Sequence, residues 1–193
     1  MKTRLSERQQ EIIDASLEII AEKGIQSLTI KNLSKKIGLV ESAIYRHYES
    51  KTQILIALLD SISEQTQYCD ETEDAGVFEF IEKKLENHFY TFQVNPALVS
   101  VVFAEDLFQN EPQLVEKTRL KVENCISALS DLIQQGQQRG EIRADIDAGI
   151  VSTMINGSIR MLVKQWKISD YSFNLTSRGK KLIDSYRLML KNG

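Results

Sequence analysis

Residues 28–51, LTIKNLSKKIGLVESAIYRHYESK, hold the side chains of this chain that are best suited to bind a charged polymer. Tyr45, Arg46 and His47 stand in a row, and Lys51 follows four residues later. Phenol, imidazole and ammonium groups bind phosphate oxygens, and a guanidinium also binds guanine through two hydrogen bonds. The chemistry that this run favours is contact with a nucleic-acid duplex rather than catalysis.

Two short helices are expected to position these side chains. Ile30, Leu33 and Ile37 recur at three- and four-residue steps, and Gly38 ends that helix. After a turn of about three residues, a second helix carries Ile44 inward and the polar run outward. Two helices joined by a tight glycine-containing turn form a helix-turn-helix, whose second helix lies in the DNA major groove.

The charge distribution agrees with this interpretation, although the chain as a whole has a net charge of −3. Residues 1–51 hold nine Lys and Arg against seven Asp and Glu, and the excess of acid lies in the remainder. Within residues 28–51, five basic residues stand against two acidic ones. A locally positive surface on an acidic body suits a protein that binds duplex DNA without indiscriminate association.

The composition excludes several other classes of protein. With 42% hydrophobic and 26% charged residues, the chain is typical of a globular protein, and no apolar stretch approaches the roughly 18 residues of a membrane span. Its first ten residues carry no apolar signal core, so we expect a cytoplasmic protein. Cys69 and Cys125 lack metal-type spacing, which predicts reduced, packed cysteines. No cofactor and no metal site is expected.

The rest of the chain is also helical in pattern, which predicts an all-α fold of about nine helices with only two prolines to interrupt it. The first helix is expected over residues 6–23, with Ser6 as its N-cap, and Thr29 and Ser50 cap the second and fourth. Residues 67–75 read as a loop. Further helices are expected at about 78–94, 98–108, 115–139, 146–162 and 175–191. Asp145 is expected to cap the helix with Ile146, Ile150, Met154 and Met161 inward.

Over residues 8–59 the chain resembles the tetracycline-repressor (TetR) family of bacterial transcriptional regulators. The resemblance rests on a series of short motifs in order: Ala21-Glu22-Lys23-Gly24, Leu28-Thr29, Ile37-Gly38, Ile44-Tyr45-Arg46-His47-Tyr48, and Lys51 followed by Ile54-Leu55. It implies a three-helix DNA-binding domain at residues 1–50 and a helical ligand-binding and dimerisation domain at residues 51–193. Arg139-Gly140-Glu141-Ile142 followed by Asp145 resembles the connection before the family's eighth helix.

The resemblance also implies a mechanism. Members of this family bind palindromic DNA operators as homodimers, and the last two helices of each subunit form a four-helix interface. A small, largely apolar molecule in the C-terminal domain shifts the helix that starts near Lys51 and releases the DNA. Repression is the family's usual mode, so a repressor is expected.

Candidate DNA contacts follow from the resemblance and from the chemistry of each side chain. Tyr45 and Lys51 are expected on phosphates, Arg46 on guanine or phosphate, and Ala43 on a thymine methyl. Lys35 and Lys36 are expected to be solvated, and Val40 provides no side-chain cap for the recognition helix. The full set of predicted DNA-binding residues is Thr29, Lys31, Glu41, Ser42, Ala43, Tyr45, Arg46, His47 and Lys51.

The C-terminal domain offers candidates for a ligand pocket and for a dimer interface. Apolar and aromatic residues with one histidine are expected at the ligand: His88, Phe89, Phe92, Phe103, Met154, Met161 and Trp166. Small and apolar residues of the last two helices are expected at the dimer interface: Gly157, Ser158, Leu182, Tyr186 and Leu190. Ordinary core packing is the alternative for each apolar residue.

Two other functions compete with this interpretation. An enzyme is disfavoured, because the chain has two histidines, no glycine-rich phosphate loop and no nucleophile elbow. A DNA-binding dimer without a small-molecule inducer, acting as an architectural or protein-partnered regulator, is the closer alternative.

Overall fold

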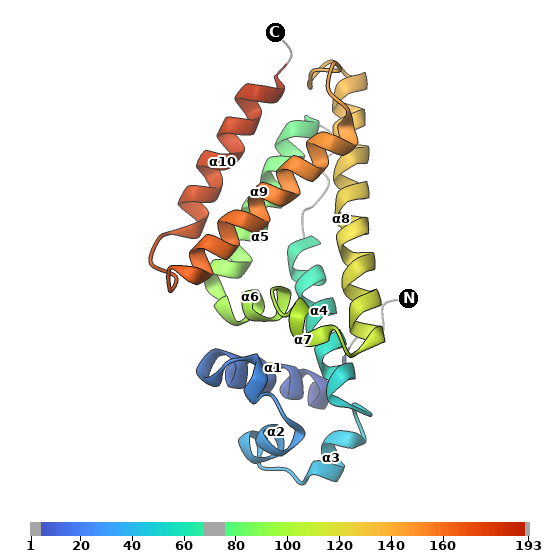
Figure 1. Cartoon of the computed structure of the whole chain (residues 1–193), viewed down its shortest axis with the longest axis vertical. Helices are drawn as coiled ribbons and strands as arrows, with labels where there is room; N and C mark the ends of the chain where they lie inside the picture. Colours follow the sequence, from blue (N-terminus) through green and yellow to red (C-terminus); the bar gives the residue numbers. More distant parts are fainter. Residues whose placement is uncertain (1–4, 68–75, 192–193) are drawn as a thin grey trace. The chain divides into compact units, whose positions relative to one another are not determined.

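The computed structural model describes residues 5–67 and 76–191, with the side chains of residues 64–67 left out of the description. These residues form ten α-helices and a short 3-10 helix, η1 at Ile25–Ser27, which confirms the all-α prediction (Figure 1). The helices are α1 Glu7–Lys23, α2 Ile30–Ile37, α3 Glu41–Tyr45, α4 Lys51–Gln67, α5 Val77–Val94, α6 Pro96–Val102, α7 Glu105–Phe108, α8 Pro112–Gln138, α9 Ala148–Ile168 and α10 Leu175–Leu190.

The chain divides into two compact units. The first unit comprises Met1–Ser63 and Asn95–Lys117, and the second comprises Glu64–Val94 and Thr118–Gly193. Most of α4 and the first turn of α8 therefore belong to the first unit, while the remainder of α8 belongs to the second. The functional boundary at residue 50 stays a prediction.

In the first unit, helix ends are set by local capping and helix positions by apolar burial. Ser6 caps α1 by accepting a hydrogen bond from the backbone N–H of Gln9, and the Gln9 side chain accepts one from the N–H of Ser6. The buried side chains of α1 include Ile12 and Ile19, which are 0% and 4% exposed. Leu33 of α2 is equally buried, and α1 packs against α2. This packing supports the turn between α2 and α3.

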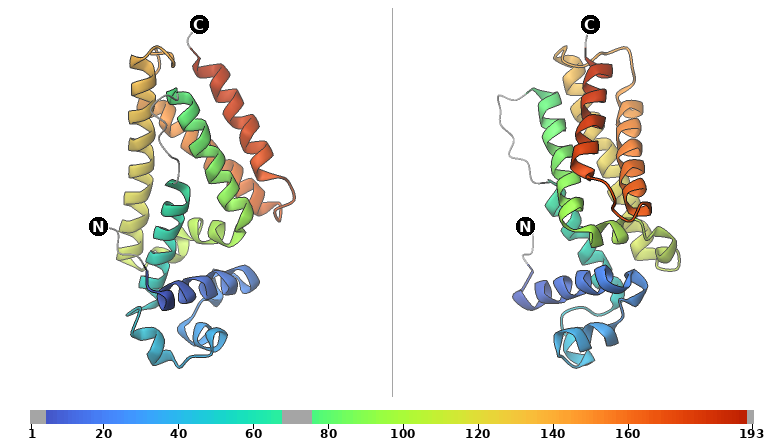
Figure 2. Two further views of the ribbon diagram at one scale, coloured as in Figure 1. Left: turned by 180° about the vertical axis from the view of Figure 1, so that it is seen from behind. Right: turned by 90° about the vertical axis from the view of Figure 1, so that its left-hand side faces the viewer.

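The second unit is built around the contact between α5 and α10, which lie side by side (Figure 2). Phe89 of α5 is fully buried, and a Cβ atom added to Gly179 of α10 would lie 2.2 Å from its ring. Near the other end of α10, Arg187 pairs with Glu82 of α5. Glycine at position 179 is therefore what allows α10 to approach α5 so closely.

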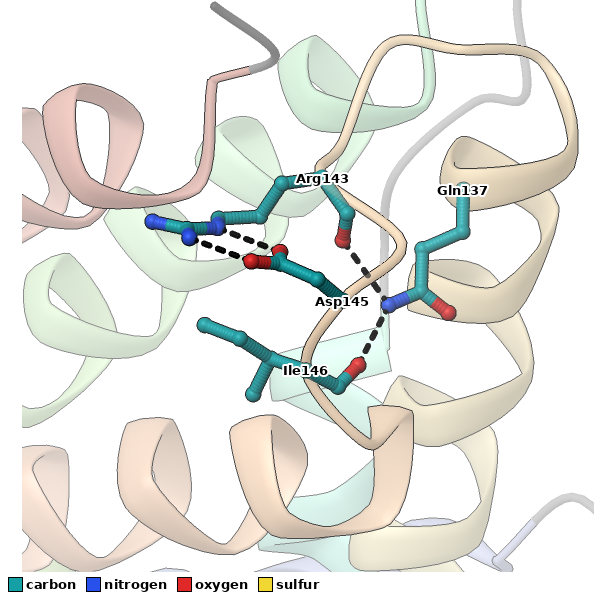
Figure 3. Close-up of polar contacts among 4 residues, drawn as sticks. All are labelled: Gln137, Arg143, Asp145 and Ile146. Carbon is teal, nitrogen blue, oxygen red and sulfur yellow. Dashed lines mark hydrogen bonds and ion pairs between the residues drawn. The ribbon is translucent and has the colours of Figure 1, made fainter.

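The connection between α8 and α9 is held by side chains rather than by regular structure (Figure 3). The Gln137 amide nitrogen donates to the carbonyl oxygens of Arg143 at 3.0 Å and Ile146 at 2.7 Å. Arg143 pairs with Asp145 through two hydrogen bonds of 2.6 Å. Glu141 accepts a hydrogen bond of 2.6 Å from the backbone N–H of Val77, the first residue of α5. The connection thus also ties down the start of α5.

Three details of the predicted helices are corrected by the structure. The helix expected at residues 98–108 is two helices, α6 and α7, because the chain leaves helical geometry at Phe103 and Ala104. Asp147 rather than Asp145 caps α9 by accepting from the N–H of Ile150 at 2.9 Å, because the helix begins at Ala148; Asp145 lies two residues before the cap and pairs with Arg143. Cys125 is exposed on α8, so the packing role predicted for it is wrong. Cys69 and the loop expected at 67–75 lie outside the described residues, except for Gln67, which ends α4.

Within the described part of the chain, no helix has the length and apolar character needed to cross a bilayer. The same residues contain no cluster of three or more side chains arranged to hold a metal ion.

Replacing Gly179 with alanine should destabilise the protein, because the new Cβ collides with a buried ring. Overpacking of this kind costs about 1–3 kcal/mol, measurable as a lower midpoint in urea. The control is the double variant Gly179→Ala with Phe89→Leu. The smaller side chain makes room, so the double variant should lose less stability than the sum of the two single changes. Strictly additive losses would contradict the proposed collision.

Candidate nucleic-acid interface

The helix-turn-helix consists of α2, the turn 38–40 and the short α3, at the foot of Figure 1. Thr29 caps α2 by accepting from the N–H of Asn32 at 3.1 Å, as predicted. Gly38 ends it with φ of 69°, a left-handed conformation that favours glycine, and the N–H of Leu39 returns to the carbonyl of Ser34 at 2.9 Å. The tight turn expected from the sequence is therefore confirmed.

The recognition helix α3 is shorter than the sequence pattern predicts. It spans Glu41–Tyr45, and Val40 provides no side-chain cap, as expected. Arg46 and His47 lie in the turn that follows, where the N–H of His47 donates to the carbonyl of Ile44 at 2.9 Å. Both residues were predicted to stand on the helix itself, whereas Arg46 is the C-cap residue of α3 and His47 lies one residue beyond it; Arg46 is exposed as expected.

The start of α4 is strongly organised. The hydroxyl oxygen of Ser50 accepts from the backbone N–H of Gln53 at 3.2 Å, which confirms Ser50 as the cap. The Gln53 side chain in turn accepts from the N–H of Glu49 at 3.0 Å. Lys51 is the first residue of the helix and is partly buried. Burial lowers its pKa and the nearby carboxylate of Glu111 opposes that change.

The predicted DNA-binding residues all lie in the first unit and differ in exposure. Tyr45 is 48% exposed, which agrees with its predicted outward position. Ala43, His47 and Lys51 are partly buried. The remaining members of the set are exposed: Thr29, Lys31, Glu41, Ser42 and Arg46. Most of the predicted DNA-binding residues are thus accessible to DNA. The individual role of each residue stays a prediction.

Lys36 is exposed, as expected, and it is also engaged in ion pairs. Its ammonium lies 2.9 Å from a carboxylate oxygen of Glu18 and 2.7 Å from one of Glu22, both on α1. The positive charge is therefore directed towards α1. The helical period places Lys36 on a surface position but does not show which acidic residues the neighbouring helix brings beside it.

Tyr48, just after the recognition turn, is 5% exposed, and no described residue hydrogen-bonds to its hydroxyl. Burial raises its pKa to about 12. Tyr48 and Ile44, which is fully buried, are both part of the apolar core. The hydroxyl group adds no hydrogen bond with a described residue to this packing.

The predicted ligand-binding residues separate into three groups. Phe89, Phe92 and Trp166 are buried in the second unit, and His88 is partly enclosed with its ring edge-on to Phe92 at 4.9 Å between centroids. Phe103 belongs to the first unit. Burial, with a smaller contribution from the charge of Lys84, lowers the pKa of His88 to about 4, so its imidazole is neutral at physiological pH.

The structure corrects the predicted positions of Met154 and Met161. They are 53% and 55% exposed on α9, so the prediction that they point into the core is wrong. Ile150, expected inward as well, is 57% exposed. The core face of α9 is formed instead by Val151, Ile155, Ile159, Val163 and Trp166. The two candidate faces of this helix are both apolar, and periodicity alone does not distinguish them.

The predicted dimer residues are corrected in part. Tyr186 and Leu190 are 7% and 5% exposed, and the Tyr186 hydroxyl donates to the carbonyl of Met154 or the hydroxyl of Ser158, at 3.0 and 2.9 Å. Both residues therefore pack within the subunit. Gly157 is exposed, while Ser158 and Leu182 are partly buried and line an open groove of about 480 Å³ between α9 and α10.

One side of α9 is an exposed apolar face that was not predicted. Ile150, Met154, Gly157, Met161 and Ile168 follow one another at steps of four, three, four and seven residues along one side of the helix. We call this surface the α9 stripe. The signal was present in the spacing, but it was assigned to the core.

The first unit thus defines a DNA-binding protein of the helix-turn-helix class. Residues 12–58 match the family described as bacterial regulatory proteins, tetR family, and residues 52–192 match the family described as YsiA-like protein, C-terminal region. Because these matches cover most of the chain, the protein belongs to the tetR family. It is a DNA-binding transcriptional regulator.

Similar proteins include regulators of several kinds. The fatty acid metabolism regulator protein of Bacillus subtilis is 25% identical over 177 residues, which cover 90% of this chain and 91% of that protein. The crystal structure of the regulator FadR from Bacillus subtilis in complex with stearoyl-CoA has a TM-score of 0.75 and 25% identity, covering 91% of this chain and 95% of that one. The nucleoid occlusion factor SlmA of Glaesserella parasuis is 27% identical over 180 residues, 90% of this chain and 87% of that protein.

Replacing Lys51 with alanine should weaken binding to every duplex sequence to a similar extent. The ammonium is expected to bind a phosphate, so its loss should reduce the slope of log K against log salt by about 0.9. Titration of a fluorescent duplex at several salt concentrations measures both quantities. Lys36→Ala is the matched control: its charge is engaged by Glu18 and Glu22, so its slope should change less. An unchanged slope for Lys51→Ala would exclude the phosphate contact.

Replacing Tyr48 with phenylalanine should leave the protein as stable as before or raise its stability by up to about 1 kcal/mol. The change removes a buried hydroxyl that has no hydrogen-bond partner among residues 5–67 and 76–191, while it keeps the ring. Thermal unfolding followed by circular dichroism gives the comparison, with Ile44→Ala as a variant that must lose stability. A loss of more than about 1 kcal/mol in Tyr48→Phe would mean that the hydroxyl has a stabilising partner.

Proposed function

We propose that this protein is a repressor that binds a palindromic operator as a homodimer in the cytoplasm and leaves it when a long-chain acyl thioester binds to its C-terminal domain. The observation that carries the DNA-binding part is the arrangement of the first unit. There the exposed Tyr45 is the last residue of the short recognition helix, the exposed Arg46 follows it, and Lys51 begins the next helix.

In this proposal some side chains bind the DNA backbone and position the protein, and others contact the bases and recognise the sequence. Tyr45 and Lys51 bind phosphates, where the ammonium and the N-terminus of α4 act together. Thr29 and Lys31 bind the backbone from the start of α2. Arg46 binds guanine or phosphate, and His47 binds beside it. Glu41, Ser42 and Ala43 lie at the start of α3, where side chains approach base edges.

The homodimer is supported by the α9 stripe. Contiguous exposed apolar surface on a terminal helix pair is costly in water, and a second copy of the same surface covers it across a twofold axis. Gly157 in the middle of the stripe leaves open space, since a Cβ added there would have no atom within 4 Å apart from its chain neighbours and the backbone of its own helix. Two helices therefore have room to approach closely at this point. The groove between α9 and α10 shares Met161 with the stripe and would be covered by the same contact.

The acyl thioester is suggested by the relatives and by the chemistry of the second unit. The Bacillus subtilis regulator in complex with stearoyl-CoA matches this chain over nearly its whole length. The neutral imidazole of His88 beside the ring of Phe92 gives the second unit a weakly polar, aromatic interior that suits an apolar chain. In this proposal residues 51–193 form the ligand-binding and dimerisation domain. We propose no catalytic activity for the protein.

Stearoyl-CoA should release the protein from its operator. The operator is first obtained by selecting bound duplexes from a random pool, and release is followed by fluorescence anisotropy below the critical micelle concentration of the thioester. Without DNA, binding at 100 times Kd should add about 2.7 kcal/mol of stability, seen as a higher melting temperature. Free coenzyme A, which lacks the apolar chain, should have neither effect. An unrelated helix-turn-helix protein on its own operator controls for detergent-like action.

The second candidate is a DNA-binding dimer that needs no small-molecule inducer. The similarity to the nucleoid occlusion factor of Glaesserella parasuis supports it, because that relative is named for a role other than gene control by a metabolite. Neither release nor thermal stabilisation by acyl thioesters of any chain length, on an operator that the protein binds tightly, would favour this candidate.

A further inference from the structure

Glu111 lies at the start of α8, within the first unit, and its backbone is firmly placed. Its N–H donates to the carbonyl of Phe108 at 2.8 Å, and its carbonyl accepts from the N–H groups of Leu114 and Val115 at 2.9 and 3.1 Å. Pro112 follows it as the first residue of α8. These hydrogen bonds fix the backbone of Glu111, and so they restrict where its side chain can lie.

That side chain reaches across to the first turn of α4. A carboxylate oxygen of Glu111 accepts a hydrogen bond of 3.0 Å from the hydroxyl of Thr52, the second residue of α4. The carboxylate is also near enough to Lys51 to raise the pKa of its ammonium against the effect of burial. A second contact joins the same two helices, because Lys117 of α8 lies 2.7 Å from Asp60 of α4.

The chemistry around the Glu111 carboxylate is that of an anion-binding position. The N-terminal end of a helix carries about half a positive charge and favours anions. A hydroxyl donor and an ammonium at the first two positions of α4 add to this preference. A DNA phosphate and a carboxylate are both satisfied by such donors, so the two anions are alternatives at the same place.

We propose that the Glu111 carboxylate is an intramolecular competitor of DNA, holding at the start of α4 the position that a backbone phosphate takes in the complex. The inference rests on the proposed function, in which Lys51 binds phosphate. In the free protein the Glu111 carboxylate neutralises the positive charge at the start of α4. When DNA binds, the carboxylate is either displaced by the phosphate or remains close to it and repels it. Either event makes the duplex bind less tightly than the same surface would without Glu111.

Replacement of Glu111 with glutamine tests this directly. Glutamine keeps an oxygen that accepts from Thr52, so the contact between the helices is preserved while the negative charge is lost. We expect DNA binding to tighten roughly two- to fivefold at low salt, with a slope of log K against log salt steeper by up to about 0.9. Because Glu111 is exposed, the melting temperature should stay close to that of the wild type.

Two further variants separate competition from a general change in charge. Asp106→Asn removes one exposed acid of α7 in the same unit, and it should tighten binding less than Glu111→Gln does. In the Lys51→Ala background, Glu111→Gln should gain little, because the phosphate contact that it frees is already gone.

The outcomes distinguish this inference from the function on which it rests. If the wild type selects no duplex, the proposed function fails and the competition fails with it. If the wild type binds with a salt dependence that Lys51→Ala reduces, and Glu111→Gln binds no tighter than Asp106→Asn, only the competition is overturned. A gain for Glu111→Gln that is equally large without Lys51 also overturns it.

Discussion

The burial of Ile44 holds the recognition segment in shape. A five-residue helix without a side-chain cap is not stable by itself, because helix nucleation costs more than one turn of hydrogen bonds returns. Ile44 is the buried residue of α3, and Tyr48 closes the same core one turn later. The outward direction of Tyr45 and Arg46 follows from this anchoring. Recognition of DNA by this protein therefore depends on the apolar packing of α3 rather than on its helix propensity.

Charge in the first unit is distributed more selectively than a count of basic residues indicates. Lys36 is engaged by two glutamates of α1, whereas Lys31 and Arg46 remain exposed. Lys51 lies at the start of α4, within the influence of Glu111. Since α8 begins at this contact and continues into the second unit, the helix that places Glu111 belongs to both units. In the proposed competition, the affinity for DNA is adjusted by a helix that also belongs to the second unit.

The second unit shows how close packing selects residues that a helical pattern leaves undetermined. Gly179 is required by the ring of Phe89, and no periodicity of apolar residues indicates it. On α9, Val151, Ile155 and Val163 form the core face, while the α9 stripe lies exposed. Both faces are apolar at helical spacing, so the assignment of Met154 and Met161 to the core had no support beyond their type. The exposed stripe is the surface that the proposed homodimer uses.

The all-α fold, the caps at Ser6, Thr29 and Ser50, the turn at Gly38 and the family could all be predicted from the amino-acid sequence. These depend on interactions within a few residues, on local φ preferences and on side-chain type. The pairing of Lys36 with α1 and the contact of Glu111 with Thr52 became visible only in the folded chain. Each of these depends on which donors and acceptors become neighbours when distant or competing segments pack together, and the spacing of residues along the chain carries no information about that.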